Sequence, residues 1–239
     1  MTAKRSDVTR AAAALAMRHF ENYGYGMLAA LVLFGVTQLS VSMREPWDSA
    51  ARAVLSIAIY VVGLLSVAST RMRFIIGATL CAVALIDEAL GFLTTGQVTS
   101  ISGAELSLIL LAFLIYCLTA DLFTRRGAVR TQLLASACLY VLLAILFSRI
   151  YLMINEAFDG KAFAGTLSGP TSDRFSRDDA LYFSFVTQTT VGFGDITPVA
   201  RPARAISVVH ATIGVLYIAV VVSSITSARA DTRADEARD

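Results

Sequence analysis

One run of seven residues, Thr189–Asp195 with the sequence TTVGFGD, constrains the fold most, because it lies between two long apolar segments. Successive carbonyls of an extended strand point to opposite sides, whereas glycine takes positive φ without steric cost. Gly192 and Gly194, one residue apart, therefore let neighbouring carbonyl oxygens face a common axis. A stack of such oxygens can replace the hydration shell of a cation. The run predicts a cation-binding backbone, which we favour over a glycine-containing turn.

The composition is typical of a membrane protein. Of the 239 residues, 56% are hydrophobic and only 16% are charged, whereas soluble domains contain about 25% charged residues. The net charge of +2 gives no basis for nucleic-acid binding. The sequence shows no nucleophile–base pair, metal-ligand spacing or phosphate-binding loop, so we predict a protein that is not an enzyme and needs no cofactor.

Six apolar stretches are long enough to cross a bilayer, which requires about 20 residues. They are residues 24–43, 50–69, 74–94, 104–122, 131–152 and 203–227. The stretch 177–188 is too short to span, and it leads directly into the glycine run, so it predicts a re-entrant helix. Ser176 and Asp179 have the spacing of a capping box at its start. The predicted fold is an all-α membrane protein with six transmembrane helices and a re-entrant helix.

Basic residues follow a pattern that predicts the orientation of the spans. Lys and Arg are concentrated before the first span, between the second and third, between the fourth and fifth, and after the last. By the positive-inside rule these segments are cytoplasmic. We therefore expect a multi-pass protein of a bacterial-type plasma membrane with both termini in the cytoplasm. The connection 153–202, which carries the glycine run, is then external.

The glycine run resembles TTVGYGD, the selectivity-filter signature of the potassium-channel family, with phenylalanine in place of tyrosine. Residues 131–228 resemble the family's pore domain, which consists of an outer helix, turret, pore helix, filter and inner helix. The resemblance implies a homotetramer, with one filter segment from each of four chains, that is selective for K⁺. It implies K⁺ binding at Thr190, Val191, Gly192 and Phe193, with Gly194 completing the filter.

The resemblance also assigns roles to residues around the filter. Asp195 is expected at the external mouth, where it attracts cations or accepts a hydrogen bond behind the filter. Support for the filter is expected from Tyr182, Phe183 and Thr189, although core packing alone would also explain the two aromatic residues. Some relatives have Glu where this chain has Val186, and Phe193 lacks the tyrosine hydroxyl. We therefore expect selectivity to survive, and leave the rigidity of the filter open.

The last apolar stretch contains candidate gating residues. Gly214 lies where the family often has a hinge glycine, but close packing between helices is an equal alternative for a small residue. Ile218 and Val222 follow at helical spacing and would form a hydrophobic constriction. His210, one turn before Gly214, is expected to serve packing or an interface, with pH-sensitive gating as the alternative.

The first four spans have the layout of a voltage sensor but lack its charges. A sensor's fourth helix carries Arg or Lys at every third position, and residues 104–122 contain neither. We therefore predict that the protein is not voltage-gated. Asp87 and Glu88 lie in the third span, where they could receive a proton, bind a cation or pair with Arg52. The alternatives are that they face a wet outer crevice or that the helix ends before them.

These inferences divide the chain into four segments. They are a cytosolic segment 1–23, a four-helix transmembrane domain 24–123, a pore domain 124–228 and a cytosolic tail 229–239. The predicted function is passive K⁺ conduction, and the expected partners are copies of the same chain, membrane lipid and K⁺, with a separate regulatory subunit left open. Two alternatives are a weakly selective cation channel and a membrane sensor or partner subunit whose pore is vestigial.

Overall fold

The computed structural model describes residues 71–95, 101–124, 129–167 and 174–236. The predicted cytosolic segment 1–23, the first two predicted spans and Arg52 lie outside these residues. In chain order, the described elements are α3 (Arg71–Thr95), α4 (Ile101–Thr124), α5 (Val129–Ala157), β1 (Phe163–Gly165), α6 (Arg177–Gln188), β2 (Ile196–Pro198) and α7 (Arg201–Glu236).

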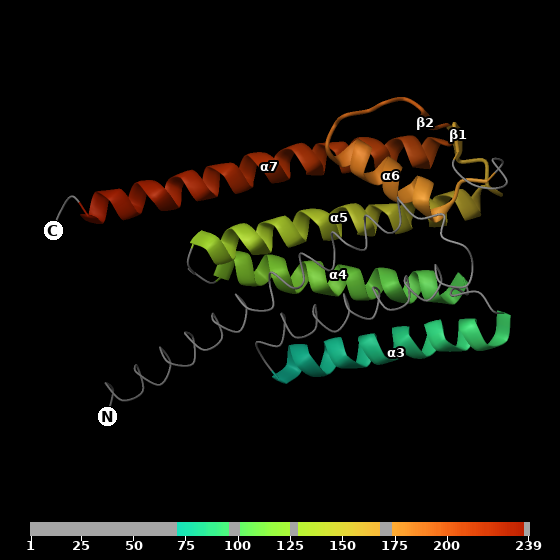
Figure 1. Ribbon diagram of the computed structural model, residues 1–239, viewed down its shortest axis with the longest axis horizontal. Helices are drawn as coiled ribbons and strands as arrows, with labels where there is room; N and C mark the ends of the chain where they lie inside the picture. The colour runs from blue at the N-terminus through green and yellow to red at the C-terminus, as the bar shows by residue number, and fades with distance from the viewer. Residues whose placement is uncertain (1–70, 96–100, 125–128, 168–173, 237–239) are drawn as a thin grey trace, which may run out of the picture. The chain divides into compact units, whose positions relative to one another are not determined.

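The described elements fall into two compact units. The first contains α3, α4 and the beginning of α5 up to Leu139, and the second extends from Tyr140 to the end of α7. Within the first unit, α3 and α4 lie side by side and run in opposite directions (Figure 1). The second unit contains α6, the glycine run and both strands, so the candidate site belongs to it entirely.

Two of the described helices are long and apolar enough to cross a membrane, over Gln132–Ala157 in α5 and Arg201–Ser224 in α7. Only 11% of the apolar window in α7 is buried, which is unlike the core helix of a soluble protein. An exposed apolar surface of this kind suits lipid or a neighbouring subunit. The apolar parts of α3 and α4 are shorter, Met72–Val83 and Leu108–Ala120, so the six-span count stays a prediction.

The helix α6 occupies the residues that the sequence predicted for the re-entrant helix. Its capping box is present: Ser176 Oγ accepts a hydrogen bond from the Asp179 amide at 3.1 Å, and the Ser176 amide donates to Asp179 Oδ2 at 2.9 Å. Asp178 and Asp179 also place negative charge in the first turn, where the helix dipole favours it. With 12 residues, α6 is too short to span a bilayer.

The two strands are a departure from the all-α prediction. β1 and β2 pair in antiparallel fashion, with Phe163 opposite Pro198 and Gly165 opposite Ile196. The Thr166 amide donates to the Asp195 carbonyl oxygen at 2.8 Å. The pairing therefore joins the segment before α6 to the segment immediately after the glycine run, as the strands beside α6 in Figure 1 show. The described structure is mostly helical rather than all-α.

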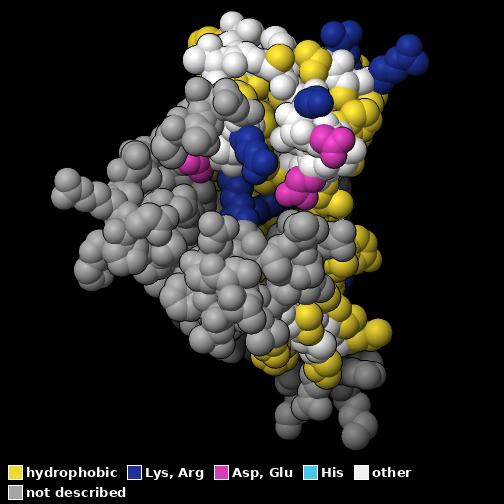
Figure 2. All heavy atoms as spheres, turned by 90° about the vertical axis from the view of Figure 1, so that its right-hand side faces the viewer, with side chains coloured by type: hydrophobic (Ala, Val, Ile, Leu, Met, Phe, Trp, Pro, Cys, Tyr) yellow, Lys and Arg dark blue, Asp and Glu magenta, His cyan; other side chains and the backbone are white. Residues whose placement is uncertain are grey.

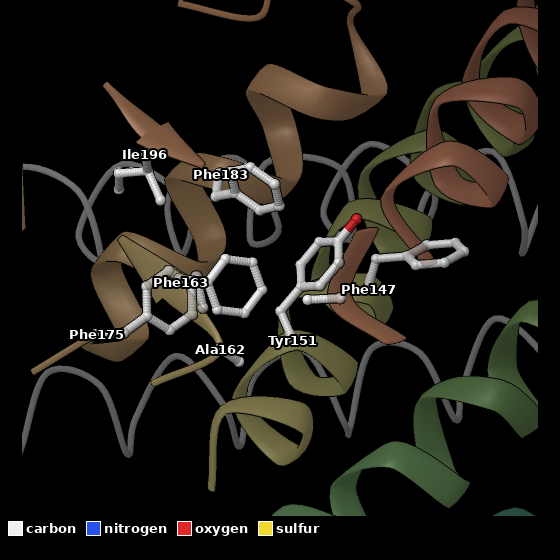
Figure 3. Close-up of a cluster of buried hydrophobic side chains, with 9 residues drawn as sticks. Phe147, Tyr151, Ala162, Phe163, Phe175, Phe183 and Ile196 are labelled. Atoms are coloured by element: carbon white, nitrogen blue, oxygen red, sulfur yellow. The ribbon is translucent and has the colours of Figure 1, made fainter. Parts of the chain in front are cut away.

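An aromatic cluster holds α5, strand β1 and α6 together (Figure 3). Phe163 stacks on Phe175 with ring centroids 4.2 Å apart, and Tyr151 meets Phe183 edge-to-face at 5.0 Å. Such aromatic pairs contribute about 0.5–1.5 kcal/mol each beyond the area they bury. Phe147 extends the cluster along α5. The cluster fixes α6, and with it the start of the glycine run.

Charged side chains lie at the end of the second unit where β1 pairs with β2. Figure 2 looks onto the end at which β1 and β2 lie, and there Lys, Arg, Asp and Glu side chains lie among hydrophobic ones. Exposed charged residues in the segments between the apolar parts of α5 and α7 are Asp159, Lys161, Arg174 and Arg177. This placement is expected where two spanning helices leave the hydrocarbon layer, because a charged side chain is costly inside it.

Candidate ion-binding site

The backbone of the glycine run alternates in handedness. Thr190, Gly192 and Gly194 have positive φ, at 59°, 57° and 79°, whereas Val191 and Phe193 do not. This alternation turns successive carbonyls toward the same side, as the spacing of the two glycines predicts. Thr190 was not anticipated from the sequence. A β-branched residue at positive φ is rare, and such backbone strain costs about 1–3 kcal/mol.

The amide groups of the run point back to α6. The Thr190 amide donates to the Thr187 carbonyl at 3.0 Å, and the Val191 and Gly192 amides donate to the Val186 carbonyl at 3.1 and 3.4 Å. Among the described residues, none donates a hydrogen bond to the carbonyl oxygen of Thr190, Val191 or Gly192. The amide donors are therefore paired with carbonyls at the end of α6, whereas these three carbonyl oxygens have no donor within the described residues.

Tyr182 and Asp195 meet behind the run. The Tyr182 hydroxyl donates to Asp195 Oδ2 at 2.6 Å, and the Ile196 amide donates to Asp195 Oδ1 at 3.0 Å. These bonds, the tyrosine bond first, hold the pKa of the Asp195 carboxyl below its usual range, and the same bond raises the pKa of Tyr182. The Tyr182 ring also stacks on Phe193, with centroids 6.4 Å apart. Tyr182 thus contacts the run at two points.

The other two predicted supporting residues have different surroundings. Phe183 is buried in the aromatic cluster, against Tyr151 and Phe163, so its contacts are with α5 and β1 rather than with the run. Thr189 caps the end of α6, where its amide and its hydroxyl donate to the Phe185 carbonyl at 2.9 and 2.7 Å. Phe183 therefore anchors α6, and Thr189 marks where α6 ends and the run begins.

Gly214 is in direct contact with the end of α6. α7 continues as one helix through this residue, and a Cβ at position 214 would overlap the carbonyl oxygen of Gln188. The close approach between the two helices therefore requires glycine, which favours the packing alternative over the hinge. Ile218 and Val222, one and two turns further, are 49% and 57% exposed in the single chain.

Sequence reasoning did not identify Gln188 as a functional candidate. Its side chain is 1% exposed, and its Oε1 lies 3.0 Å from Nε2 of His210, which is fully buried. A glutamine at the end of an amphipathic helix and a histidine within an apolar one were the available signals. Their pairing depends on the packing of α6 against α7, which no local pattern reveals.

The comparison with known proteins covers the same part of the chain. Residues 137–229 match the family model described as an ion channel. The chain is 34% identical over 87 residues to "Two pore potassium channel c" of Oryza sativa subsp. japonica, a match over 36% of this chain and 19% of that protein. The resemblance to potassium channels is confirmed.

A second relative is bacterial. Protein LctB of Bacillus caldotenax is 33% identical over 85 residues, which cover 35% of this chain and 62% of that protein. The matched segment thus spans about a fifth of the rice protein and about three fifths of the bacterial one. The apolar helices and the match of residues 137–229 to an ion-channel model indicate a membrane protein. The matched part contains α6, the glycine run and most of α7.

Helices α3 and α4 lie outside the ion-channel match. α3 continues through Asp87 and Glu88 to Thr95, so the alternative that the helix ends before this pair is wrong. α4 carries Glu105 and Asp121 and no Lys or Arg. Within the described residues, no group of three or more His, Cys, Asp or Glu is placed to hold a metal ion. The roles suggested for Asp87, Glu88 and Arg52 stay predictions.

Proposed function

We propose that the chain forms a potassium-selective channel that conducts K⁺ passively across the membrane. The observation that carries the proposal is the alternating backbone of Thr190–Gly194, in which positive φ at every second residue frees a row of carbonyl oxygens. Rings of backbone carbonyls are the ligands that replace the hydration shell of K⁺ in channels. We assign the K⁺ sites to Thr190, Val191, Gly192 and Phe193, with Gly194 completing the filter.

The proposed assembly is a homotetramer. One chain supplies a single wall of carbonyls, so a complete ring requires several copies about an axis, and cyclic symmetry closes such a ring. Val191 and Phe193 are 53% and 68% exposed in the single chain, as expected of residues that neighbouring copies cover. The resemblance to potassium channels sets the number of copies at four. We place this assembly in a plasma membrane with both termini in the cytoplasm.

Two electrostatic features of the site favour a cation. The C-terminus of α6 immediately precedes the filter, and that end of a helix carries roughly half a negative charge. At the other end of the filter, Asp195 carries an ionised carboxylate at neutral pH, and the hydrogen bond from Tyr182 lowers its pKa below the ordinary value of 3.8. Negative potential at both ends raises the local concentration of K⁺.

A flux measurement with a matched pair of variants tests the proposal. Purified protein in liposomes is given a K⁺ gradient, and a matched Na⁺ gradient is run beside it. Gly192→Ala and Gly160→Ala are ideal partners because both glycines have positive φ, at 57° and 78°, with no other atom within 4 Å of an added Cβ. Only Gly192 belongs to the filter, so we expect Gly192→Ala alone to abolish K⁺ flux.

Other outcomes would point to the alternatives. Flux of both ions would support a weakly selective cation channel, which the missing hydroxyl at Phe193 and the apolar Val186 would explain. No flux across a range of pH and voltage would support a sensor or partner subunit with a vestigial pore. Equal loss of flux in Gly160→Ala and Gly192→Ala would mean that backbone strain, not the filter, limits activity.

A further inference from the structure

Four residues form a buried chain of hydrogen bonds between α5, α6 and α7. The Tyr151 hydroxyl lies 3.0 Å from His210 Nδ1, and His210 Nε2 lies 3.0 Å from Gln188 Oε1. Gln188 Nε2 in turn donates to the backbone carbonyl of Tyr140 at 2.7 Å. The side chains of Tyr151, His210 and Gln188 are at most 1% exposed. Burying a polar group costs free energy unless the group is hydrogen-bonded, so the loss of any one of these partners would destabilise this arrangement.

The bonding pattern determines where the protons lie. The Tyr140 carbonyl can only accept, so the Gln188 amide nitrogen faces it and the amide oxygen faces His210. That oxygen can only accept as well, so His210 carries its proton on Nε2. Nδ1 of the neutral ring is then the acceptor for the Tyr151 hydroxyl. The Tyr151 hydroxyl thus donates to His210, His210 donates to Gln188 and Gln188 donates to the Tyr140 carbonyl, so these bonds run in one direction.

Two residues of α7 contact Gln188, which is the last residue of α6. His210 binds the side chain of Gln188, and Gly214, one turn later on α7, lies against its backbone carbonyl. Gln188 is the last residue of α6 and stands two positions before Thr190, where the strained alternating backbone begins. The Tyr140 hydroxyl also donates to the Gln188 carbonyl, at 3.4 Å.

We propose that His210 is a positioning residue for the filter. Through its bond to Gln188 it holds the C-terminal end of α6 against α7. The orientation of the carbonyls from Thr190 onward then follows the position of α7. A displacement of α7 would then change the orientation of the filter carbonyls, in addition to the width of the predicted constriction at Ile218 and Val222. This inference rests on the proposed channel function.

If His210 served only to pack its ring, different substitutions would preserve its role than if it acted through the hydrogen bond to Gln188. His210 stacks on Phe147 with centroids 3.8 Å apart and planes at 10°, so the ring also contributes packing. Glutamine cannot reproduce this stack, but its amide can reach the place of Nε2 and donate to Gln188. Asparagine is shorter and reaches only the place of Nδ1. His210→Gln and His210→Asn therefore separate the hydrogen bond from the ring.

The test measures the K⁺/Na⁺ permeability ratio of the reconstituted full chain and the assembly state of each variant. We expect His210→Leu to lower the ratio about fivefold, equivalent to the roughly 1 kcal/mol of one neutral hydrogen bond, and His210→Asn to do the same. His210→Gln should stay close to the parent. Ser148→Ala is the control, because Ser148 is buried but its hydroxyl donates at 2.7 Å within its own helix, to Ile145.

A double-variant cycle completes the test. Both changes break the bond between His210 and Gln188. If that bond carries the effect of His210, His210→Leu combined with Gln188→Met should lower the ratio no further than Gln188→Met alone. Equal ratios for His210→Gln and His210→Asn would overturn the inference, as would an assembled His210→Leu variant with the parent ratio. If the parent conducts K⁺ but the variants do not behave as expected, only the positioning role of His210 is rejected. If the parent shows no K⁺ flux, the proposed channel function and the role of His210 are rejected together.

Discussion

The Tyr182 hydroxyl and the Asp195 carboxylate lie 2.6 Å apart, although 13 residues separate them in the chain. The bond runs from the middle of α6 to the residue that ends the glycine run, so it ties the far end of the run back to α6. Because Tyr182 also stacks on Phe193, the same side chain restrains the filter at two points.

Removal of the tyrosine hydroxyl should loosen the filter. We expect Tyr182→Phe to preserve the ring stack on Phe193 but to speed the decay of K⁺ current, because Asp195 loses its side-chain donor. Single-channel or liposome recordings of current decay measure this effect. Tyr116→Phe, on an α4 side chain that is 66% exposed, is the control. Unchanged decay in Tyr182→Phe would show that the bond does not restrain the filter.

The same bond predicts a dependence on acid pH. The pKa of Asp195 is lower in the folded chain than its ordinary value of 3.8, so its contribution to stability is present above that value. It is lost as the pH falls through the lower, folded pKa. In Tyr182→Phe the folded pKa should rise toward 3.8, and acid inactivation should begin at higher pH. Coincident acid-inactivation curves for parent and variant would contradict the prediction.

The pairing of β1 with β2 should be sensitive to one added methyl group. Gly165 has φ of 137°, and a Cβ there would overlap the carbonyl oxygen of Asp195. Gly165→Ala should therefore unfold at lower temperature than Gly160→Ala, which pays only about 1–2 kcal/mol for a left-handed conformation in open space. Thermal unfolding in detergent compares the two. Equal decreases in unfolding temperature would show that the close approach of Gly165 to Asp195 does not affect stability.

A substitution at Gly214 can distinguish a packing role from a hinge role, because the two roles predict changes in different properties. If the residue is needed for the contact with Gln188, Gly214→Ala should reduce assembly and thermal stability, because a backbone oxygen must move. A hinge glycine would instead leave assembly intact and alter how often the channel opens, since alanine favours a helix by only about 1 kcal/mol over glycine. Assembly by size-exclusion chromatography and recordings of opening distinguish the two.

Thr190 has a strained backbone and carries a side-chain hydroxyl next to its proposed K⁺-binding carbonyl. Thr190→Gly should relieve about 1–3 kcal/mol of strain but remove the hydroxyl, whereas Thr190→Ser retains the hydroxyl. We expect K⁺ to raise the unfolding temperature of the parent and of Thr190→Ser, because a ligand of the native state stabilises it, and to raise that of Thr190→Gly less. Equal shifts in all three proteins would remove the hydroxyl from the K⁺ site.

The features that the sequence predicted correctly depend on neighbouring residues. The bounds of α6 follow from its capping box and from the glycine run after it, and the positive φ of Gly192 and Gly194 follows from the absence of a Cβ. The apolar stretches of α5 and α7 were visible for the same reason, because length and hydrophobicity along one segment suffice to indicate a spanning helix.

The features that it did not predict bring together residues far apart in the chain. The pairing of β1 with β2 involves strands of three residues on either side of α6, too short for a periodic signal. The bond between His210 and Gln188 and the contact of Gly214 with Gln188 exist only because α7 packs across the end of α6. Thr190 takes positive φ against its own preference because its amide is bound to the last turn of that helix. The sequence by itself determined which residues can present a row of carbonyls, and only the tertiary structure decided what holds that row in place, because those contacts depend on distance in space rather than on spacing along the chain.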